Sequence, residues 1–375
     1  MTSLLHDLLF DTRERCDHLR RELDSLEDRL PAHLLPFRDR WSQLVEGCRG
    51  RIESLLADPD LGDPRLASNL YISYKIVTQF LFEVEAGPLV VLARFQEGDL
   101  FLTRLLKQIC REIGYPGPAP VGSMGSSQYY GALPNVDIVI VPPLEGFQLL
   151  GLADLYHELA HFVLRRNADK LVAPFHVRID RVFNGLIEDA RRRNATPGEI
   201  DSLETSRAAW KRSWHEEFVA DMIATLWVGP AFGWANVRLC TNTSSNLFAG
   251  TTSHPADAAR HRGVDLMLRR LGFGKDADRI DAWWQGLLDL VDKGIPNDFD
   301  LQYPPKLLQT LCDFLYVEVP RLGLVAWSAR PTTDDPRIGS LLNQAWRLFR
   351  DSPAAFAEHE RGLLESLHAD LDIQT

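Results

Sequence analysis

The sequence predicts a mainly α protein with a small β-sheet. Apolar residues recur every three or four positions through the first and last thirds of the chain, which is the period of a helix packed on one face. Only one short stretch in the middle, rich in valine and isoleucine, has the character of strands. With 375 residues, the chain is long enough for two or three domains or for one large helical body.

Residues 1–114 are expected to form an N-terminal helical region that begins with an antiparallel hairpin. Two apolar seams with helical spacing indicate its helices: Cys16, Leu19, Leu23, Leu26 and Leu30, then Phe37, Trp41, Leu44, Cys48, Ile52 and Leu55. The stretch between them, "LPAHLLP", contains prolines and favours a turn. Further helices are expected over residues 66–84 and 98–113. Seams this short are more typical of internal packing than of a zipper, and such a hairpin could also dock a protein partner.

Residues 115–270 are expected to form a central region that contains the strands. It opens with "YPGPAPVGSMGSS", whose glycines, prolines and serines favour turns. Behind this break, "QYYGAL" and "NVDIVIVPP" predict a short strand pair. We expect the strand around Val136–Val141 to lie over the next helix with a free edge, where an extended peptide could pair.

Residues 271–375 are expected to form a C-terminal helical region. Three segments have helical periodicity: "IDAWWQGLLDLVDKG", "PKLLQTLCDFLYVEV" and "GSLLNQAWRLF". The chain has no internal repeat and no low-complexity tract.

Composition argues against several classes of protein. The formal net charge of -11 is unfavourable for a nucleic-acid partner. The cysteines are odd in number, scattered and without a C-x-x-C pair, so we expect reduced thiols in the cytoplasm rather than disulfides or a thiolate zinc site. The best apolar stretch begins at Met222 and is interrupted by Gly-Pro, so no membrane span is expected.

The stretch "LYHELAHFVL", residues 155–164, contains a candidate metal motif. His157 and His161 are four residues apart and share one face of a helix, so both imidazoles can reach one ion about 2 Å away. Glu158 lies beside this pair, where a carboxylate can accept a proton from water. This is the H-E-x-x-H arrangement of zinc peptidases. The alternative is a pair of core histidines bonded to backbone carbonyls.

A catalytic zinc site needs a third protein ligand, and two segments can supply it. "WHEEFVADMIATL" contains Glu217 and Asp221, again four apart in an apolar context, so one could bind zinc and the other could orient a ligand histidine. "FNGLIEDARRR" offers Glu188 as an alternative metal ligand.

Three motifs in order resemble a known family. His157-Glu158-x-x-His161 is followed by Glu217-x-x-Ala220-Asp221 and then by "SHPADAAR", which contains His254 and Arg260. This set is similar to that of the gluzincin peptidases of the CAAX prenyl protease and heat-shock membrane peptidase type. The resemblance covers roughly residues 129–270 and implies a zincin-like metallopeptidase core there. The two helical regions predicted above would flank this core.

The same resemblance implies a role for each of these residues. Glu217 would be the third zinc ligand, Asp221 its supporting carboxylate and Glu158 the general base. His254 would lie near the substrate carbonyl, and Arg260 would buttress the site.

The expected function is therefore that of a cytoplasmic, zinc-dependent metalloendopeptidase acting on peptide or protein substrates. His254 is the first candidate to stabilise the oxyanion, with Tyr129 and Tyr130 behind it. Two alternatives stay open. One is an inactive helical scaffold stabilised by zinc, and the other is a regulated peptidase component that binds a partner through the N-terminal hairpin.

Overall fold

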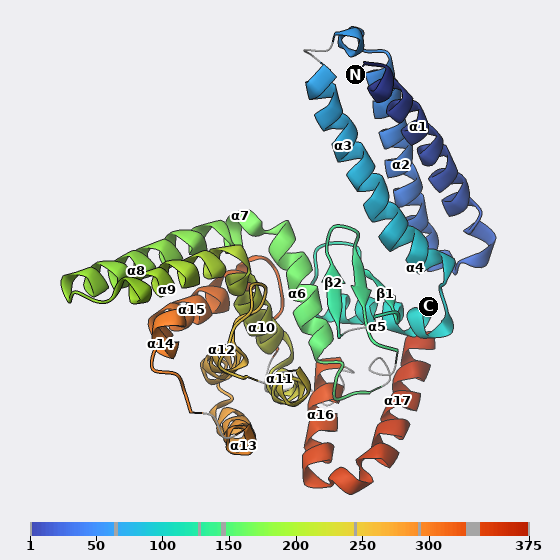
Figure 1. Cartoon of the computed structure of the whole chain (residues 1–375). Helices are drawn as coiled ribbons and strands as arrows, with labels where there is room; N and C mark the ends of the chain where they lie inside the picture. The colour runs from blue at the N-terminus through green and yellow to red at the C-terminus, as the bar shows by residue number, and fades with distance from the viewer. Residues whose placement is uncertain are drawn as a thin grey trace. The chain divides into compact units, whose positions relative to one another are not determined.

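The computed structural model describes residues 2–63, 67–126, 129–143, 148–243, 246–291, 294–327 and 338–373. It confirms a mainly α fold with one small mixed β-sheet (Figure 1). The chain divides into two compact units, Met1–Leu100 and Phe101–Thr375. The three regions predicted from the sequence, 1–114, 115–270 and 271–375, have different boundaries, because the C-terminal helices pack on the central ones within the second unit.

The first unit is built on the predicted helical hairpin. Helices α1 (Thr2–Asp24) and α2 (Leu35–Leu56) run antiparallel, since Arg49 pairs with Asp17 at 2.7 Å and Ser42 bonds to Asp24 at 3.0 Å. The first apolar seam is buried as expected. In α2, however, Val45 is buried and the predicted seam residue Leu44 is 42% exposed. One helical turn contains 3.6 residues, so the next position on a face can follow after three or four residues; from Trp41 the buried face continues to Val45, four residues on.

A second long helical run completes this unit. Helix α3 (Ala67–Val84) continues through a π-helical turn, Glu85–Leu89, into α4 (Val90–Ala93). The turn contains Pro88, whose missing N–H is accommodated by the widened backbone there. The part Asn69–Ala93 is long and apolar enough to cross a membrane. Less than half of its most apolar 18-residue window is buried. A helix was predicted over residues 66–84, but its continuation to Ala93 and its membrane-spanning length were not. Core helices of soluble proteins have the same length and composition, so it assigns no location.

The sheet of the second unit has the order β1-β3-β2. Strands β2 (Gly131–Leu133) and β3 (Ile138–Ile140) are the predicted strand pair, and they run antiparallel. Strand β1 (Val121–Ser123) lies in the stretch predicted to be a turn-rich break and pairs parallel with β3. The expectation that the strand around Val136–Val141 has a free edge is wrong, because β3 is paired on both sides. Within the described residues, β2 is the edge strand that contacts α6 (Asp154–Arg166), the helix that contains the H-E-x-x-H motif.

Helix α5 (Glu97–Glu112) supports this sheet from one side. Thr103 Oγ1 accepts a hydrogen bond from the backbone N–H of Gly122 at 3.0 Å. A Cβ at Gly122 would lie 2.4 Å from the side chain of Leu102, so only glycine permits this close approach.

Four helices form the centre of the second unit: α6 (Asp154–Arg166), α10 (His215–Val228), α11 (Pro230–Thr243) and α12 (Asp257–Arg270). Helix α10 is buried on nearly every side and contacts α6, α11 and α12. It therefore runs through the middle of the core, where its few polar side chains need partners. A π-helical turn, Trp210–Trp214, precedes it, and Trp210 stacks on Phe218.

Peripheral helices cover this core. Helices α7 (Ala168–Leu171), α8 (Ala173–Arg192) and α9 (Pro197–Ala209) follow α6 along the chain, and α8 packs on α9. The three predicted C-terminal helices are present as α13 (Gly274–Val291), α15 (Pro305–Arg321) and α16 (Ile338–Asp351). Two further helices were not predicted: α14 (Phe299–Gln302) and α17 (Phe356–Ile373). Helix α15 contacts α8, α10 and α12, and α16 contacts α10 and α11. These contacts join the C-terminal region to the core that contains the candidate site.

Candidate metal centre

Helix α6 places the two histidines of the H-E-x-x-H motif on one face. Their Nε2 atoms lie 3.1 Å apart, and the rings meet at 81°. Two neutral imidazole nitrogens at this distance need a proton or a cation between them, because their lone pairs otherwise face each other. The alternative of two core histidines bonded to backbone carbonyls does not describe His157, whose Nδ1 bonds to a carboxylate instead.

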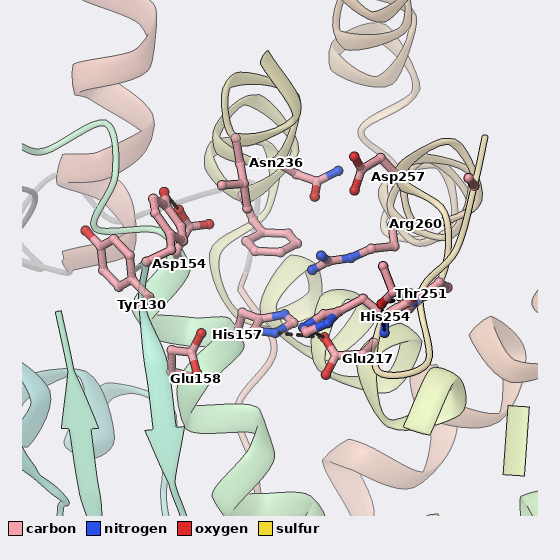
Figure 2. A pocket seen from close by; sticks show the side chains of 15 residues that line it. Tyr130, Asp154, His157, Glu158, Glu217, Asn236, Thr251, His254, Asp257 and Arg260 are labelled. Atoms are coloured by element: carbon pink, nitrogen blue, oxygen red, sulfur yellow. Dashed lines mark hydrogen bonds and ion pairs between the residues drawn. The ribbon is translucent and has the colours of Figure 1, made fainter. Parts of the chain in front are cut away.

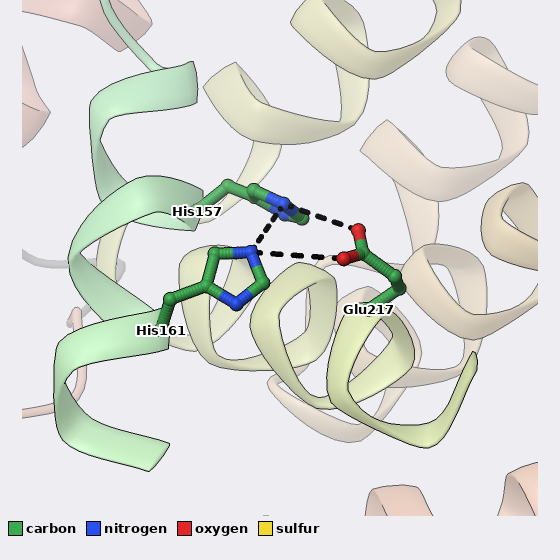
Figure 3. Close-up of side chains that lie close together, drawn as sticks. All are labelled: His157, His161 and Glu217. Atoms are coloured by element: carbon green, nitrogen blue, oxygen red, sulfur yellow. Dashed lines mark hydrogen bonds and ion pairs between the residues drawn. The ribbon is translucent and has the colours of Figure 1, made fainter. Parts of the chain in front are cut away.

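Glu217 reaches the same point from α10 (Figure 3). Its Oε2 lies 3.5 Å from His157 Nε2, and its Oε1 lies 3.8 Å from His161 Nε2. The donor atoms of the three residues all lie within 4.8 Å of one another, and no other group of this kind occurs in the described parts of the chain. Glu217 Oε2 is buried and accepts no hydrogen bond. A buried carboxylate oxygen without a donor and two facing imidazoles fit a metal ion, and two histidines with one carboxylate are a common set of zinc ligands.

A second carboxylate on α10 supports the first histidine. Asp221, one turn after Glu217, is completely buried and accepts a hydrogen bond from His157 Nδ1–H at 2.8 Å. Arg260 of α12 donates to both oxygens of Asp221, at 2.7 and 2.8 Å. Because Nδ1 of His157 is used in this series of hydrogen bonds, Nε2 is the ring nitrogen that faces Glu217. A ligand histidine is commonly oriented in this way by a carboxylate bonded to its other nitrogen.

The pKa values reflect a buried, strongly coupled group of charges. Burial lowers the pKa of His157, but its hydrogen bond to Asp221 and its close contact with the Glu217 carboxylate outweigh this and raise the pKa to about 10. Burial and the charge on His157 lower the pKa of His161 to about 4. Burial alone would raise the pKa of Glu217, yet the close contact with His157 and the nearby charges lower it to about 2. Without a metal, these shifts favour a protonated His157 beside an ionised Glu217.

Glu158 lies beside these ligands without joining them. It is buried, it lines a cavity at the metal centre, and burial raises its pKa to about 7. A carboxylate with a pKa near neutrality can both accept and return a proton.

The cavity has a volume of about 390 Å³ and opens from the metal centre toward α11 and the start of α12. Figure 2 shows Glu158 and Tyr130 on one side of it and His254 and Thr251 on the other. His254 Nε2 lies 3.7 Å from Glu217 Oε2, while its Nδ1 lies 2.9 Å from Ser253 Oγ. If the Ser253 hydroxyl donates to Nδ1, the tautomer with Nε2–H faces the metal centre.

Hydrogen bonds hold the loop that contains His254. Trp214 Nε1 donates to the carbonyl of Thr251 at 2.8 Å, and the Thr251 N–H donates to the His254 carbonyl at 2.8 Å. Ala256 N–H donates to the Tyr303 hydroxyl at 3.0 Å. The position of His254 at the cavity mouth is thus set by contacts on both sides of the loop.

Most of the predicted site residues come together at this centre. His157, His161, Glu217, Asp221 and Arg260 are linked by the contacts above, and Glu158 and His254 line the adjoining cavity. Tyr129 and Tyr130 line it as well. The alternative ligand, Glu188, lies exposed on α8 and is not a member of the three-residue group.

Sequence analysis did not find three further polar residues of the cavity. Asp154 lies one helical turn before His157, so helical spacing could have placed it on the same face. Asn236 on α11 and Asp257 on α12 belong to no recognised motif, and only the fold brings them to the cavity.

Comparison of the chain with protein-family models, with curated proteins and with solved structures finds no match.

Proposed function

We propose that this protein is a zinc-dependent metalloendopeptidase of the gluzincin type. The observation that supports it most is the arrangement of Glu158 beside three convergent ligand side chains: His157, His161 and Glu217. A purely structural zinc site is usually closed by four protein ligands, whereas this group offers three and adjoins a cavity. The three ordered sequence motifs support the same proposal.

In this proposal His157, His161 and Glu217 hold the zinc ion. When bound, zinc would polarise the scissile carbonyl and lower the pKa of water at the site. Asp221 keeps His157 in the tautomer that ligates through Nε2, and Arg260 keeps Asp221 ionised and oriented.

Glu158 is the general base and acid of the proposed reaction. Its carboxylate takes the proton from the attacking water, and the resulting acid returns the proton to the leaving amine. In the metal-free protein, burial raises the pKa of this carboxyl to about 7, which supports its assignment as the group that transfers the proton. His254 donates from Nε2–H to the developing oxyanion, and Tyr130, which lines the cavity opposite, is the second candidate.

The substrate backbone has a place to pair in this proposal. Strand β2 contacts α6, and its outer edge has no partner strand within the described residues. An extended peptide that adds to this edge would be recognised mainly through its main chain. The lining residues Tyr129 and Tyr130, which directly precede β2, connect this edge to the cavity.

The test is hydrolysis of a complex peptide mixture, such as a proteome digest, by zinc-loaded protein. Mass spectrometry of the new termini detects cleavage without a guess at the sequence preference. We expect cleavage with the wild type and none with Glu158→Gln, with an equal zinc content in both. No new termini from a protein that holds zinc would reject the peptidase and favour the zinc-stabilised scaffold.

A further inference from the structure

Helix α11 presents one face to the cavity beside the metal centre. Phe232, Asn236 and Leu239 are spaced by four and three residues, and all of them line this cavity. Phe232 shows where the face lies, because its ring is within 9° of parallel to the His157 ring and the two centroids are 6.3 Å apart. Asn236 follows one helical turn later. The α11 wall of the cavity therefore has an amide between two apolar side chains.

The amide of Asn236 is buried without a hydrogen-bond acceptor. The residue is 2% exposed, and its Nδ2 has no hydrogen-bond partner in the described parts of the chain. Figure 2 shows Asp257 and Arg260 beside it. Asp257 does not accept a hydrogen bond from Nδ2, and Arg260 is itself a donor whose bonds go to Asp221. A buried N–H group without an acceptor is unfavourable for folding.

The cavity provides a reason for this unsatisfied donor. Nδ2 contributes no hydrogen bond to the packing of α11 against its neighbours, so the fold itself does not require it. A donor on a cavity wall is satisfied when a ligand brings an acceptor, and every residue of a peptide has a carbonyl oxygen that can accept. Functional sites commonly keep such groups at a cost in stability. The position and chemistry of Asn236 thus indicate a contact with substrate.

From these observations we infer that Asn236 binds a carbonyl oxygen of a substrate residue that flanks the scissile bond. Its Nδ2–H donates to this oxygen, while Phe232 and Leu239 pack against the aliphatic part of the same residue. The carbonyl belongs either to the main chain or to a side-chain amide such as that of glutamine. Asn236 therefore acts in binding and specificity, separately from proton transfer by Glu158. The inference rests on the proposed function, because it names a substrate contact of that site.

Three small hydroxamates test this inference, because each anchors on the metal and they differ in whether and where they have a further carbonyl. N-acetyl-norleucine hydroxamate has it in the position of the main chain. In 4-carbamoyl-2-propylbutanohydroxamate it lies at the end of the side chain, and 2-propylhexanohydroxamate lacks it. Dissociation constants are measured by titration calorimetry on zinc-loaded wild type and Asn236→Leu. Asn297→Leu makes the same substitution at an exposed position outside the cavity and is the matched control.

We expect one of the two probes with a further carbonyl to bind wild type and Asn297→Leu more tightly than 2-propylhexanohydroxamate does. The ratio should be about three- to tenfold, the effect of one neutral hydrogen bond. The probe that shows it identifies the source of the carbonyl. In Asn236→Leu this preference should disappear, while 2-propylhexanohydroxamate keeps its affinity and so reports an intact metal centre. Asn236→Ala removes the amide without adding bulk and should give the same result.

Urea unfolding of the metal-free protein separates this role from a structural one. Because Nδ2 has no partner in the folded protein, Asn236→Leu should be at least as stable as wild type. A loss of stability in Asn236→Leu, together with weaker binding of all three probes, would assign the amide to the fold and overturn the inference.

Equal binding of the three probes to wild type would also overturn it and would leave the proposed peptidase intact. A preference that persists in both Asn236→Leu and Asn236→Ala would overturn the role of Asn236. Failure of all three probes to bind the zinc-loaded protein would reject an accessible metal position, and the proposed function would fall with the inference.

Discussion

Arg260 and Asp221 form a two-point ion pair in the centre of the second unit. The guanidinium Nε lies 2.7 Å from Oδ2 and Nη2 lies 2.8 Å from Oδ1, with both side chains buried. Because Oδ1 also accepts from His157 Nδ1–H, the pair connects α12 and α10 to helix α6, which contains the two candidate histidine ligands. The geometry of a candidate metal ligand thus depends on an arginine from a third helix.

Replacing Asp221 by asparagine should weaken both zinc binding and folding. The change leaves Arg260 buried without its counter-ion, which costs about 3–5 kcal/mol when a buried pair is broken. It also frees the His157 ring, and loss of such an orienting carboxylate lowers metal affinity about 10–100-fold. Chelator competition measures the zinc affinity, and urea unfolding of the metal-free protein measures the stability. Glu188→Gln, at an exposed position, is the control. Equal zinc affinity and equal stability in Asp221→Asn and Glu188→Gln would contradict this role for Asp221.

Glu158→Gln should remove peptide hydrolysis and leave the metal centre intact. Glutamine keeps the size of the side chain but cannot accept a proton, and general acid–base catalysis contributes about 10²–10⁴-fold to a rate. The cleavage rate of a peptide identified in the digest and the zinc content are measured on the same preparation. A variant that keeps the wild-type rate would show that another group is the base.

Gly250→Ala should disturb the loop that contains His254. A Cβ at this position would lie 2.5 Å from the Tyr303 hydroxyl and 2.8 Å from the Trp214 ring, and these side chains anchor the loop. We expect a loss of about 1–3 kcal/mol in stability from overpacking and a lower cleavage rate with zinc retained. Gly286→Ala on α13 is the matched control, because nothing lies within 4 Å of its added methyl. Equal cleavage rates in the two variants would argue against a function for this loop.

Stability should fall as the pH drops, in part because of His261. This residue is buried on α12, stacks on Trp284 and faces Asp281 at 3.4 Å. Burial lowers its pKa below the ordinary 6.5 despite the opposing effect of Asp281. Below pH 6.5 the unfolded chain binds a proton at this ring, whereas the folded protein keeps the ring neutral. The contribution of His261 to the free energy of unfolding is therefore complete above pH 6.5 and is lost as the pH falls below that value.

The variant His261→Gln isolates this effect. Its free energy of unfolding should depend less on pH than that of wild type between about pH 7 and pH 5, whereas His18→Gln, at an exposed position, should behave as wild type. Both are measured by urea unfolding of the metal-free protein. An unchanged pH dependence in His261→Gln would contradict the prediction.

The helices and the candidate metal ligands could be predicted because their signals in the sequence are local. Apolar residues at every third or fourth position indicated the helices. A spacing of four residues placed His157 and His161 on one helix face, and Glu217 and Asp221 on another. The apolar neighbours of Glu217 and Asp221 in the sequence indicated that both side chains are buried, as they are on α10. Glu188 on α8 is exposed.

The remainder depends on contacts between distant segments. Strand β1 has three residues in a glycine-rich stretch, too few to show alternation, and its position depends on the close approach of Leu102 to Gly122. Without β1, the central place of β3 could not be foreseen. Asn236 and Asp257 reach the cavity only because α11 and α12 pack beside α10. A single sequence contains no local pattern that predicts which distant helices will pack together.

The metal content of purified protein tests the central claim most directly. Wild type, Glu217→Ala and Glu188→Ala are loaded with zinc, desalted identically and measured by mass spectrometry. The account predicts one zinc ion per chain in wild type and Glu188→Ala and its loss in Glu217→Ala. Zinc retained in Glu217→Ala, or a wild type that binds none, would contradict it.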